Sequence, residues 1–178
     1  ERITDIQLTL IRRFIDLGVD GGYFGDDYGA QKNMLFSPDM WRQLIKPRFA
    51  RMYKATKQLL HQYNPNGKVM AHTDGDVYPI IPDYIEMGLD VLNPVQPYVA
   101  EMEHTKLKAE FGDRLSFHGG IDLQNVLPFG TPEEVREEAV KVMRALGPGG
   151  GYLLAPTHYL LPDVPPENVI ALRDAVME

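Results

Sequence analysis

The sequence predicts an α/β fold in which short parallel strands alternate with helices. Two observations support this prediction. Segments with helical spacing of apolar residues, bounded by helix start and stop signals, alternate along the chain with short apolar runs. Strands that are separated in this way by helices usually pair in parallel through helical crossovers. The alternation alone fits both an open doubly wound sheet and part of a closed barrel.

The first two helices frame the first predicted strand. Apolar residues at helical spacing precede Gly18, a typical C-terminal glycine, and a strand at 22–24 follows. A long helix begins at Ser37, a suitable N-cap, and Pro47 is expected to kink it. The apolar residues of the first helix are Ile3, Ile6, Leu10, Phe14 and Leu17, and the stripe expected to be buried in the second is Trp41, Leu44, Ile45, Phe49, Met52, Thr56, Leu59, Leu60 and Tyr63.

The remaining elements continue the alternation. The capping-box sequence at 131–134 begins a helix that Gly147 ends, and Pro165 opens the last helix. Further helices are expected at about 76–87 and 103–111. The predicted strands are 68–72, 90–93, 115–118 and 152–155.

Composition excludes several classes of function. The chain of 178 residues is long enough for one domain, and 44% hydrophobic with 24% charged residues is ordinary for a soluble globular protein. A net charge of -7 with scattered cations argues against nucleic acid or a membrane surface as partner. Cysteine is absent, which excludes disulfides and thiolate ligands and fits a cytoplasmic protein. The sequence also lacks a signal-peptide pattern and a nucleotide-binding glycine loop.

Polar side chains recur where the predicted strands end. In parallel α/β folds, ligands and chemistry collect at the carboxyl ends of the strands. The sequence therefore predicts a functional mouth at this edge. The residues concerned are Asp26 and Asp27 after the first strand, His72 and Asp74 at the second, Gln96 after the third, His118 and Asp122 at the fourth, and Thr157 and His158 after the fifth.

His72 and Asp74 form half of a candidate metal site. They lie two residues apart at a strand end, so their side chains can point the same way. An imidazole with a carboxylate suits zinc, and His158 would complete three protein ligands with a fourth position left open. A metal-free site, in which these side chains bind substrate or one another, is the alternative that the residues leave open.

Several motifs occur together in a characteristic order. They are Gly25-Asp26-Asp27-Tyr28-Gly29, His72-Thr73-Asp74-Gly75, Gly88-Leu89-Asp90-Val91-Leu92-Asn93, Phe117-His118-Gly119-Gly120-Ile121-Asp122, Gly151-Tyr152-Leu153-Leu154-Ala155-Pro156-Thr157-His158 and the closing 162–168. The ordered set resembles the uroporphyrinogen decarboxylase superfamily over nearly the whole chain. The resemblance implies a (β/α)8 TIM barrel, of which residues 1–178 hold roughly the last five strands. The first three strands are then expected upstream of Glu1, and that missing half or self-association would cover the open sheet edges.

The resemblance implies two kinds of chemistry. True uroporphyrinogen decarboxylases act on tetrapyrrole acetate groups without metal or organic cofactor; Asp27 falls at a substrate-contacting serine of that branch, and His158 matches its C-terminal histidine. The other branch comprises zinc methyltransferases that transfer methyl groups between corrinoid proteins and thiols. Their ligands are an HxC motif and a later cysteine, where this chain has Asp74 and His158. The Leu-Ala-Pro run before Thr157 is closer to the methyltransferases.

These observations lead to one functional prediction with two alternatives. The prediction is a metal-assisted, methyltransferase-like enzyme with zinc as its metal and a corrinoid or corrinoid protein as candidate co-substrate. The first alternative is cofactor-free decarboxylation of a tetrapyrrole, and the second is a non-enzymatic ligand-binding barrel. The predicted metal ligands are His72, Asp74 and His158, the predicted catalytic residues are Asp27, His118 and His158, and the predicted substrate-binding residues are Asp26, Gln96 and Asp122.

Overall fold

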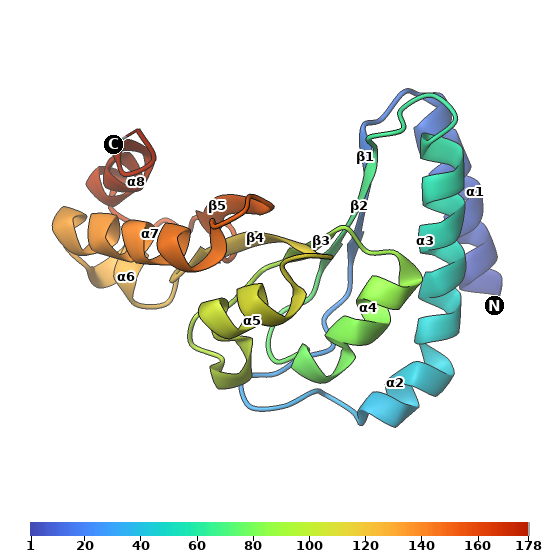
Figure 1. Cartoon of the computed structure of the whole chain (residues 1–178), viewed down its shortest axis with the longest axis horizontal. Coiled ribbons are helices and arrows are strands. Elements are labelled where there is room, and N and C mark those ends of the chain that lie inside the picture. The colour runs from blue at the N-terminus through green and yellow to red at the C-terminus, as the bar shows by residue number, and fades with distance from the viewer. Residues whose placement is uncertain (178) are drawn as a thin grey trace. The chain divides into compact units, whose positions relative to one another are not determined.

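Short parallel strands with intervening helices make up the computed structural model, which describes residues 1–177 (Figure 1). The strand order is β1-β2-β3-β4-β5, so neighbouring strands follow one another in the sequence. β1 pairs with β2 and β4 pairs with β5, both in parallel. The predicted α/β class with parallel strands is therefore confirmed. The chain divides into two compact units, Glu1–Leu92 and Asn93–Glu178, which are described separately.

The first unit begins with a helix, a strand and a helix pair. The predicted kink at Pro47 is a complete break, because two helices meet at Ile45. Pro47 has no N–H with which to continue the hydrogen-bond ladder of the preceding helix. The bounds are α1 Arg2–Asp16, β1 Gly21–Gly25, α2 Pro38–Leu44, α3 Lys46–Leu60, β2 Lys68–His72, η1 Tyr78–Ile80 and α4 Ile81–Met87.

The stripe predicted for the long helix is buried only in part. Trp41, Met52, Thr56 and Leu60 are buried, whereas Leu44 and Tyr63 are exposed, which corrects the prediction at these two positions. The break at Ile45 explains the first error, since residues on either side of it no longer share one helical face. Tyr63 lies beyond the end of α3 at Leu60, and its hydroxyl donates to the carbonyl of Val19 instead. Ile45, Phe49 and Leu59 are half-buried.

Aromatic rings fill much of the first unit's interior. Tyr53 and Trp41 are fully buried, and Phe24 of β1 packs 4.9 Å from the Tyr53 ring. The Trp41 ring lies 5.9 Å from Tyr28 and 5.5 Å from Tyr84 of α4. These contacts fasten β1, α2, α3 and α4 to one another. They hold in place the strand ends that carry the polar residues described below.

The helix predicted at 76–87 begins later than expected. Residues 78–80 form a 3-10 turn, and α4 starts only at Ile81. Pro79 and Pro82 lack the N–H groups that a longer α-helix would need at these positions. Asp83 of α4 accepts hydrogen bonds from Arg42 and Lys46, which ties α4 to α2 and α3.

The second unit contains the remaining elements, with β3 crossing its boundary. The capping box is confirmed: Thr131 Oγ1 accepts from the Glu134 N–H, and the Glu134 carboxylate accepts from the Thr131 N–H. The short helix α6 was not predicted. The bounds are β3 Val91–Asn93, η2 Ala100–Met102, α5 His104–Phe111, β4 Ser116–Ile121, α6 Val126–Phe129, α7 Pro132–Leu146, β5 Tyr152–Pro156 and α8 Pro166–Asp174.

Strand β4 runs three residues further than the predicted 115–118. Gly119 and Gly120 have φ angles of 114° and 92°, a region that side chains rarely adopt. A side chain at position 120 would also lie 2.9 Å from the Val142 side chain of α7. These two glycines let the strand continue to Ile121 while α7 packs closely against it, directly after His118.

Helix α1 is less covered than the other long helices. It lies beside α3 in the first unit, but Ile3, Ile6, Phe14 and Leu17 are 58–80% exposed. By contrast, Val135, Ala139, Val142 and Leu146 of α7 are buried.

Among residues 1–177, no helix combines the length and apolar character that crossing a membrane requires.

Candidate functional site

The loops after β1 and β2 bring three predicted site residues together in the first unit. Gly25 pairs in register with His72, so the two strands end at the same level. The N–H of Asp26 donates to the His72 carbonyl at 3.1 Å, and the N–H of Asp74 donates to Asp27 Oδ1 at 3.0 Å. The two loops are therefore hydrogen-bonded to each other directly beyond the strand ends.

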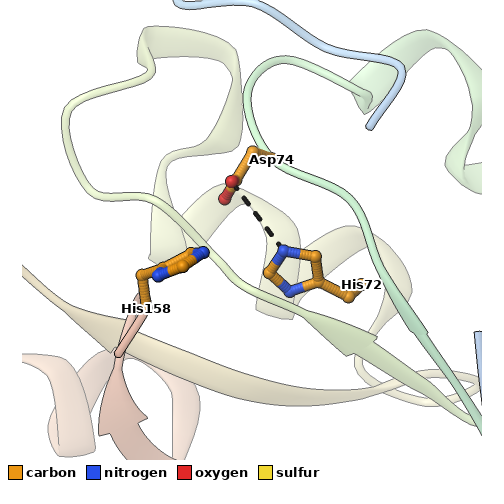
Figure 2. A group of neighbouring side chains, drawn as sticks. All are labelled: His72, Asp74 and His158. Atoms are coloured by element: carbon orange, nitrogen blue, oxygen red, sulfur yellow. Dashed lines mark ion pairs between the residues drawn. The ribbon is translucent and has the colours of Figure 1, made fainter. Parts of the chain in front are cut away.

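Two carboxylates converge on the imidazole of His72. Its Nε2 lies 3.8 Å from Asp74 Oδ2 and 3.9 Å from Asp27 Oδ1 (Figure 2 draws the ion pair with Asp74). The His72 side chain is 18% exposed, Asp74 29% and Asp27 54%. Two carboxylates beside one ring nitrogen form an environment that suits a bound metal cation. We refer to Asp27, His72 and Asp74 as the carboxylate–histidine cluster.

Two glycines allow the loops of this cluster to touch. A Cβ atom at Gly29 would lie 2.5 Å from the Asp74 carbonyl oxygen. One at Gly75, whose φ is 74°, would lie 2.5 Å from the Gly29 carbonyl carbon. The Asp76 N–H donates across the same contact to the Ala30 carbonyl at 2.8 Å. The spacing of the carboxylates is thus fixed by contact between backbones.

The donor set of the cluster fits a zinc ion. Imidazole nitrogen and carboxylate oxygen bind zinc at about 2.0–2.2 Å, so two ligands of one tetrahedral ion lie roughly 3.4 Å apart. The 3.8 Å between His72 Nε2 and Asp74 Oδ2 is close to that value and too long for a direct hydrogen bond. The pair therefore matches the chemistry and approximate spacing of two zinc ligands.

Asp26 lies on a different side of the same loop. It lines a cavity of about 560 Å³ with residues of α1, β1, α2 and α3, including Tyr28, Phe49 and Arg48. Burial, with a smaller contribution from the charge of Asp27, raises the pKa of Asp26. Asp27, its neighbour, is placed beside His72 instead. The predicted role of Asp26 in substrate binding stays a prediction.

In the second unit, His118 is held by an asparagine. Nδ2 of Asn93 lies 3.2 Å from both the Nδ1 atom and the carbonyl oxygen of His118. The imidazole is half-buried, and burial lowers its pKa. His118 is thus kept neutral beside a neutral amide.

Gln96 and Asp122 form hydrogen bonds within their own loops. Gln96 is buried, and its Nε2 donates to the Tyr98 hydroxyl at 3.1 Å. Asp122 Oδ1 accepts from the backbone N–H groups of Gln124 and Asn125 at 2.7 and 2.9 Å, and Oδ2 accepts from the Asn125 side chain at 3.0 Å. Asp122 therefore closes the loop before α6. Its predicted contact with substrate is not tested by this arrangement.

His158 follows the end of β5 in the second unit, as predicted. It is exposed, and its ring packs edge-on against Tyr159 at 4.7 Å. The preceding Thr157 is buried, and its N–H donates to the Ile121 carbonyl at 3.1 Å. This bond extends the pairing of β4 and β5 up to the residue before His158, and so fixes the point where the histidine leaves the sheet.

Asn93 and Thr73 are two polar residues that the sequence reasoning did not single out. Thr73 is fully buried, and its Oγ1 accepts from the Tyr28 N–H at 3.1 Å, which positions the loop beside Asp27. Asn93 ends β3, so the rule that selected His72 and His118 would have found it. Thr73 follows the end of β2, so the same rule covers it, but its partner Tyr28 lies 45 residues away in the chain and could not be inferred from the strand end.

Comparison with known proteins places the chain in a family. A family model described as uroporphyrinogen decarboxylase (URO-D) matches residues 1–178. The chain is 26% identical to uroporphyrinogen decarboxylase of Pelodictyon phaeoclathratiforme, with 99% of this chain and 47% of the relative covered. It is 28% identical to that of Psychromonas ingrahamii, with 84% of this chain and 42% of the relative covered. The chain thus spans about half the length of these relatives.

A solved structure extends the comparison to another activity. A methyltransferase from Methanosarcina mazei superposes with a TM-score of 0.74 at 25% identity, covering 97% of this chain and 46% of that one. The strand order, the parallel pairing and the family match together identify the architecture as part of a (β/α)8 barrel. The chain belongs to the uroporphyrinogen decarboxylase (URO-D) family.

Proposed function

We propose that this chain carries the metal-binding part of a zinc-assisted, methyltransferase-like enzyme. The observation that carries the proposal is the convergence of Asp27 and Asp74 on His72 Nε2. The similarity to the Methanosarcina mazei methyltransferase supports the same reaction class. His72 and Asp74 are the proposed ligands, since both belong to the strand-end motif of β2.

His158 is the proposed third ligand. In a closed barrel the carboxyl ends of all strands meet at one mouth, and His158 directly follows the end of β5. An imidazole adds a donor of the kind that zinc prefers (Figure 2 draws the three side chains). The fourth position would accept the nucleophilic acceptor. Two nitrogen donors and one carboxylate oxygen leave a bound zinc more Lewis-acidic than thiolate ligands would, so it would lower the pKa of that acceptor.

Asp27 is the proposed base and positioning group of this site. Its Oδ1 accepts the Asp74 N–H and lies 3.9 Å from His72, so it stands beside both proposed ligands. Its side chain is 54% exposed and can receive the proton that an acceptor loses. The methyl donor we propose is a corrinoid. Such a donor would supply a methyl group to the acceptor, and Asp27 would take up the proton that the acceptor loses.

Zinc binding by purified protein tests this proposal. We expect about one zinc ion per chain by elemental analysis, lost in His72→Ala and in His158→Ala. His61→Ala is the matched control, because His61 is an exposed histidine that contacts the Gly67 carbonyl. Folded protein that binds no zinc, or zinc that is retained in His72→Ala, would contradict the proposed ligand set.

Decarboxylation of a tetrapyrrole is the second candidate. The names of the Pelodictyon and Psychromonas relatives favour it, and Asp26, whose pKa is raised by burial and by the charge of Asp27, lines a cavity of the first unit. Incubation of the full-length protein with uroporphyrinogen, with and without a zinc chelator, separates the two. Chelator-resistant loss of carboxyl groups would establish the second candidate and displace the first.

A further inference from the structure

We infer that Asn93 fixes His118 as the Nε2–H tautomer, so that this histidine is a hydrogen-bond donor at the site and not a general base. One amide nitrogen of Asn93 makes two contacts with His118, and both residues belong to the second unit. The tautomer stands independently of the proposed function. The role that it gives His118 toward substrate rests on that function.

The partners of the Asn93 amide determine its orientation. Oxygen and nitrogen of such a group are distinguished by their partners. A backbone carbonyl oxygen can only accept, so the Asn93 atom 3.2 Å from the His118 carbonyl has to be the donor, Nδ2. The reverse orientation would place two acceptor oxygens against each other.

A second contact of the same nitrogen determines the tautomer of His118. The same Nδ2 atom lies 3.2 Å from Nδ1 of His118. An amide nitrogen donates two hydrogens and accepts none, so Nδ1 accepts the second hydrogen and carries no proton of its own. A neutral imidazole without a proton on Nδ1 carries it on Nε2. Burial lowers the pKa of His118, which keeps the ring in this neutral form.

The side chain of His118 lies on the face of β4 opposite to Phe117. Phe117 and Leu92 are fully buried, whereas their strand neighbours His118 and Asn93 have side chains on the opposite side by alternation. His118 and Asn93 therefore share one face of the strands. The Tyr152 hydroxyl donates to the Gly119 carbonyl at 2.7 Å and secures the backbone directly after His118.

The Nε2–H tautomer determines which kind of substrate group His118 can bind. A neutral Nε2–H donor binds an oxygen acceptor such as a carboxylate, a carbonyl or an amide group. His118 would then hold such an oxygen of the substrate, while Asn93 acts as a positioning residue through its two contacts with His118. A substrate group that needs to lose a proton would find no base at His118.

Nuclear magnetic resonance of the histidine ring nitrogens tests the inference directly. In protein labelled with ¹⁵N-histidine, long-range proton–nitrogen correlations show which ring nitrogen carries the proton. Assignment uses loss of the His118 signals in His118→Gln. We expect His118 to show a protonated Nε2 and an unprotonated Nδ1 at pH 8. A protonated Nδ1 in the unmodified protein would overturn the inference.

Asn93→Asp supplies the second arm. A carboxylate only accepts hydrogen bonds, so it should draw the proton to Nδ1 and reverse the tautomer of His118. Asn66→Asp adds the same charge in an exposed turn and should leave the tautomer unchanged. An unaltered tautomer in folded Asn93→Asp would also count against the inference. Neither result depends on zinc, so failure of the proposed function would be seen separately in the metal analysis.

Discussion

His72 and His118 stand on strands of the two units in opposite surroundings. His72 Nε2 has a carboxylate oxygen on each side, at 3.8 and 3.9 Å. His118 instead meets the neutral amide of Asn93 on Nδ1, and burial lowers its pKa. The first environment favours a bound cation and the second a neutral ring. The difference teaches that the neighbours of a strand-end histidine, and not its position, determine what it can do.

The largest expected effect separates the two histidines by their affinity for zinc. His72→Ala removes a proposed ligand and should weaken zinc binding by about 100-fold or more, because loss even of an outer hydrogen-bond partner costs 10–100-fold. His118→Ala should leave zinc affinity within about twofold. Competition with a chromophoric chelator measures both values. Equal losses in the two variants would remove the distinction between the sites.

Asp27→Asn should have a smaller effect on the same measurement. The substituted side chain keeps an oxygen that can accept the Asp74 N–H, so it removes charge with little change of shape. We expect zinc affinity to fall about 10-fold, as for a partner outside the ligand shell. A loss as large as that of His72→Ala would show that Asp27 is itself a ligand.

Asp122→Ala tests the carboxylate that resembles Asp27 in sequence position but not in surroundings. It removes acceptors for two backbone N–H groups and one side chain before α6. The free energy of unfolding should fall by about 1–2 kcal/mol, as for loss of a helix cap, while zinc affinity is unchanged. Urea denaturation measures the stability. Unaltered stability together with weakened zinc binding would show that Asp122 contributes to the metal site.

Mild acidification should destabilise the chain modestly through its buried histidines. Burial lowers the pKa of both His118 and His104, below the value of about 6.5 in the unfolded chain. The unfolded chain then binds protons that the folded chain does not, so the stabilisation is present above about pH 6.5 and declines as the pH falls below it. Urea denaturation at pH 8 and pH 5.5 measures this difference, and His104→Gln should reduce it. Greater stability at pH 5.5 would reverse the sign and contradict the prediction.

The sequence was most informative where local chemistry decides the structure. The short apolar run located β2 at its observed bounds, 68–72, and the capping box located the start of α7. Prediction from the sequence was wrong where helix periodicity and proline residues gave opposing signals. Helix periodicity continued through Pro47, Pro79 and Pro82, although each of these residues lacks the N–H group that continuation requires.

The candidate site could be predicted only as far as residue spacing reaches. The separation of two residues placed His72 and Asp74 on one side, and the structure confirms it. Spacing could not reveal that the Asp122 carboxylate accepts hydrogen bonds from its own loop. It also could not reveal that the side chains of Asp26 and Asp27 lie in different surroundings. Nor could it pair Asn93 with His118, since that contact joins residues 25 positions apart through the packing of strands.

The contact between Gly29 and Gly75 has a consequence for the entropy of ion binding. Main-chain atoms of the two loops already touch, so their carboxylates stand near one another before any cation arrives. Binding of an ion to such a preorganised site requires little further ordering of the loops. The entropic cost of binding is therefore small, and the ion binds more tightly. A methyl group added at either glycine would push the loops apart, and the ion would then have to draw them together again at the expense of that affinity.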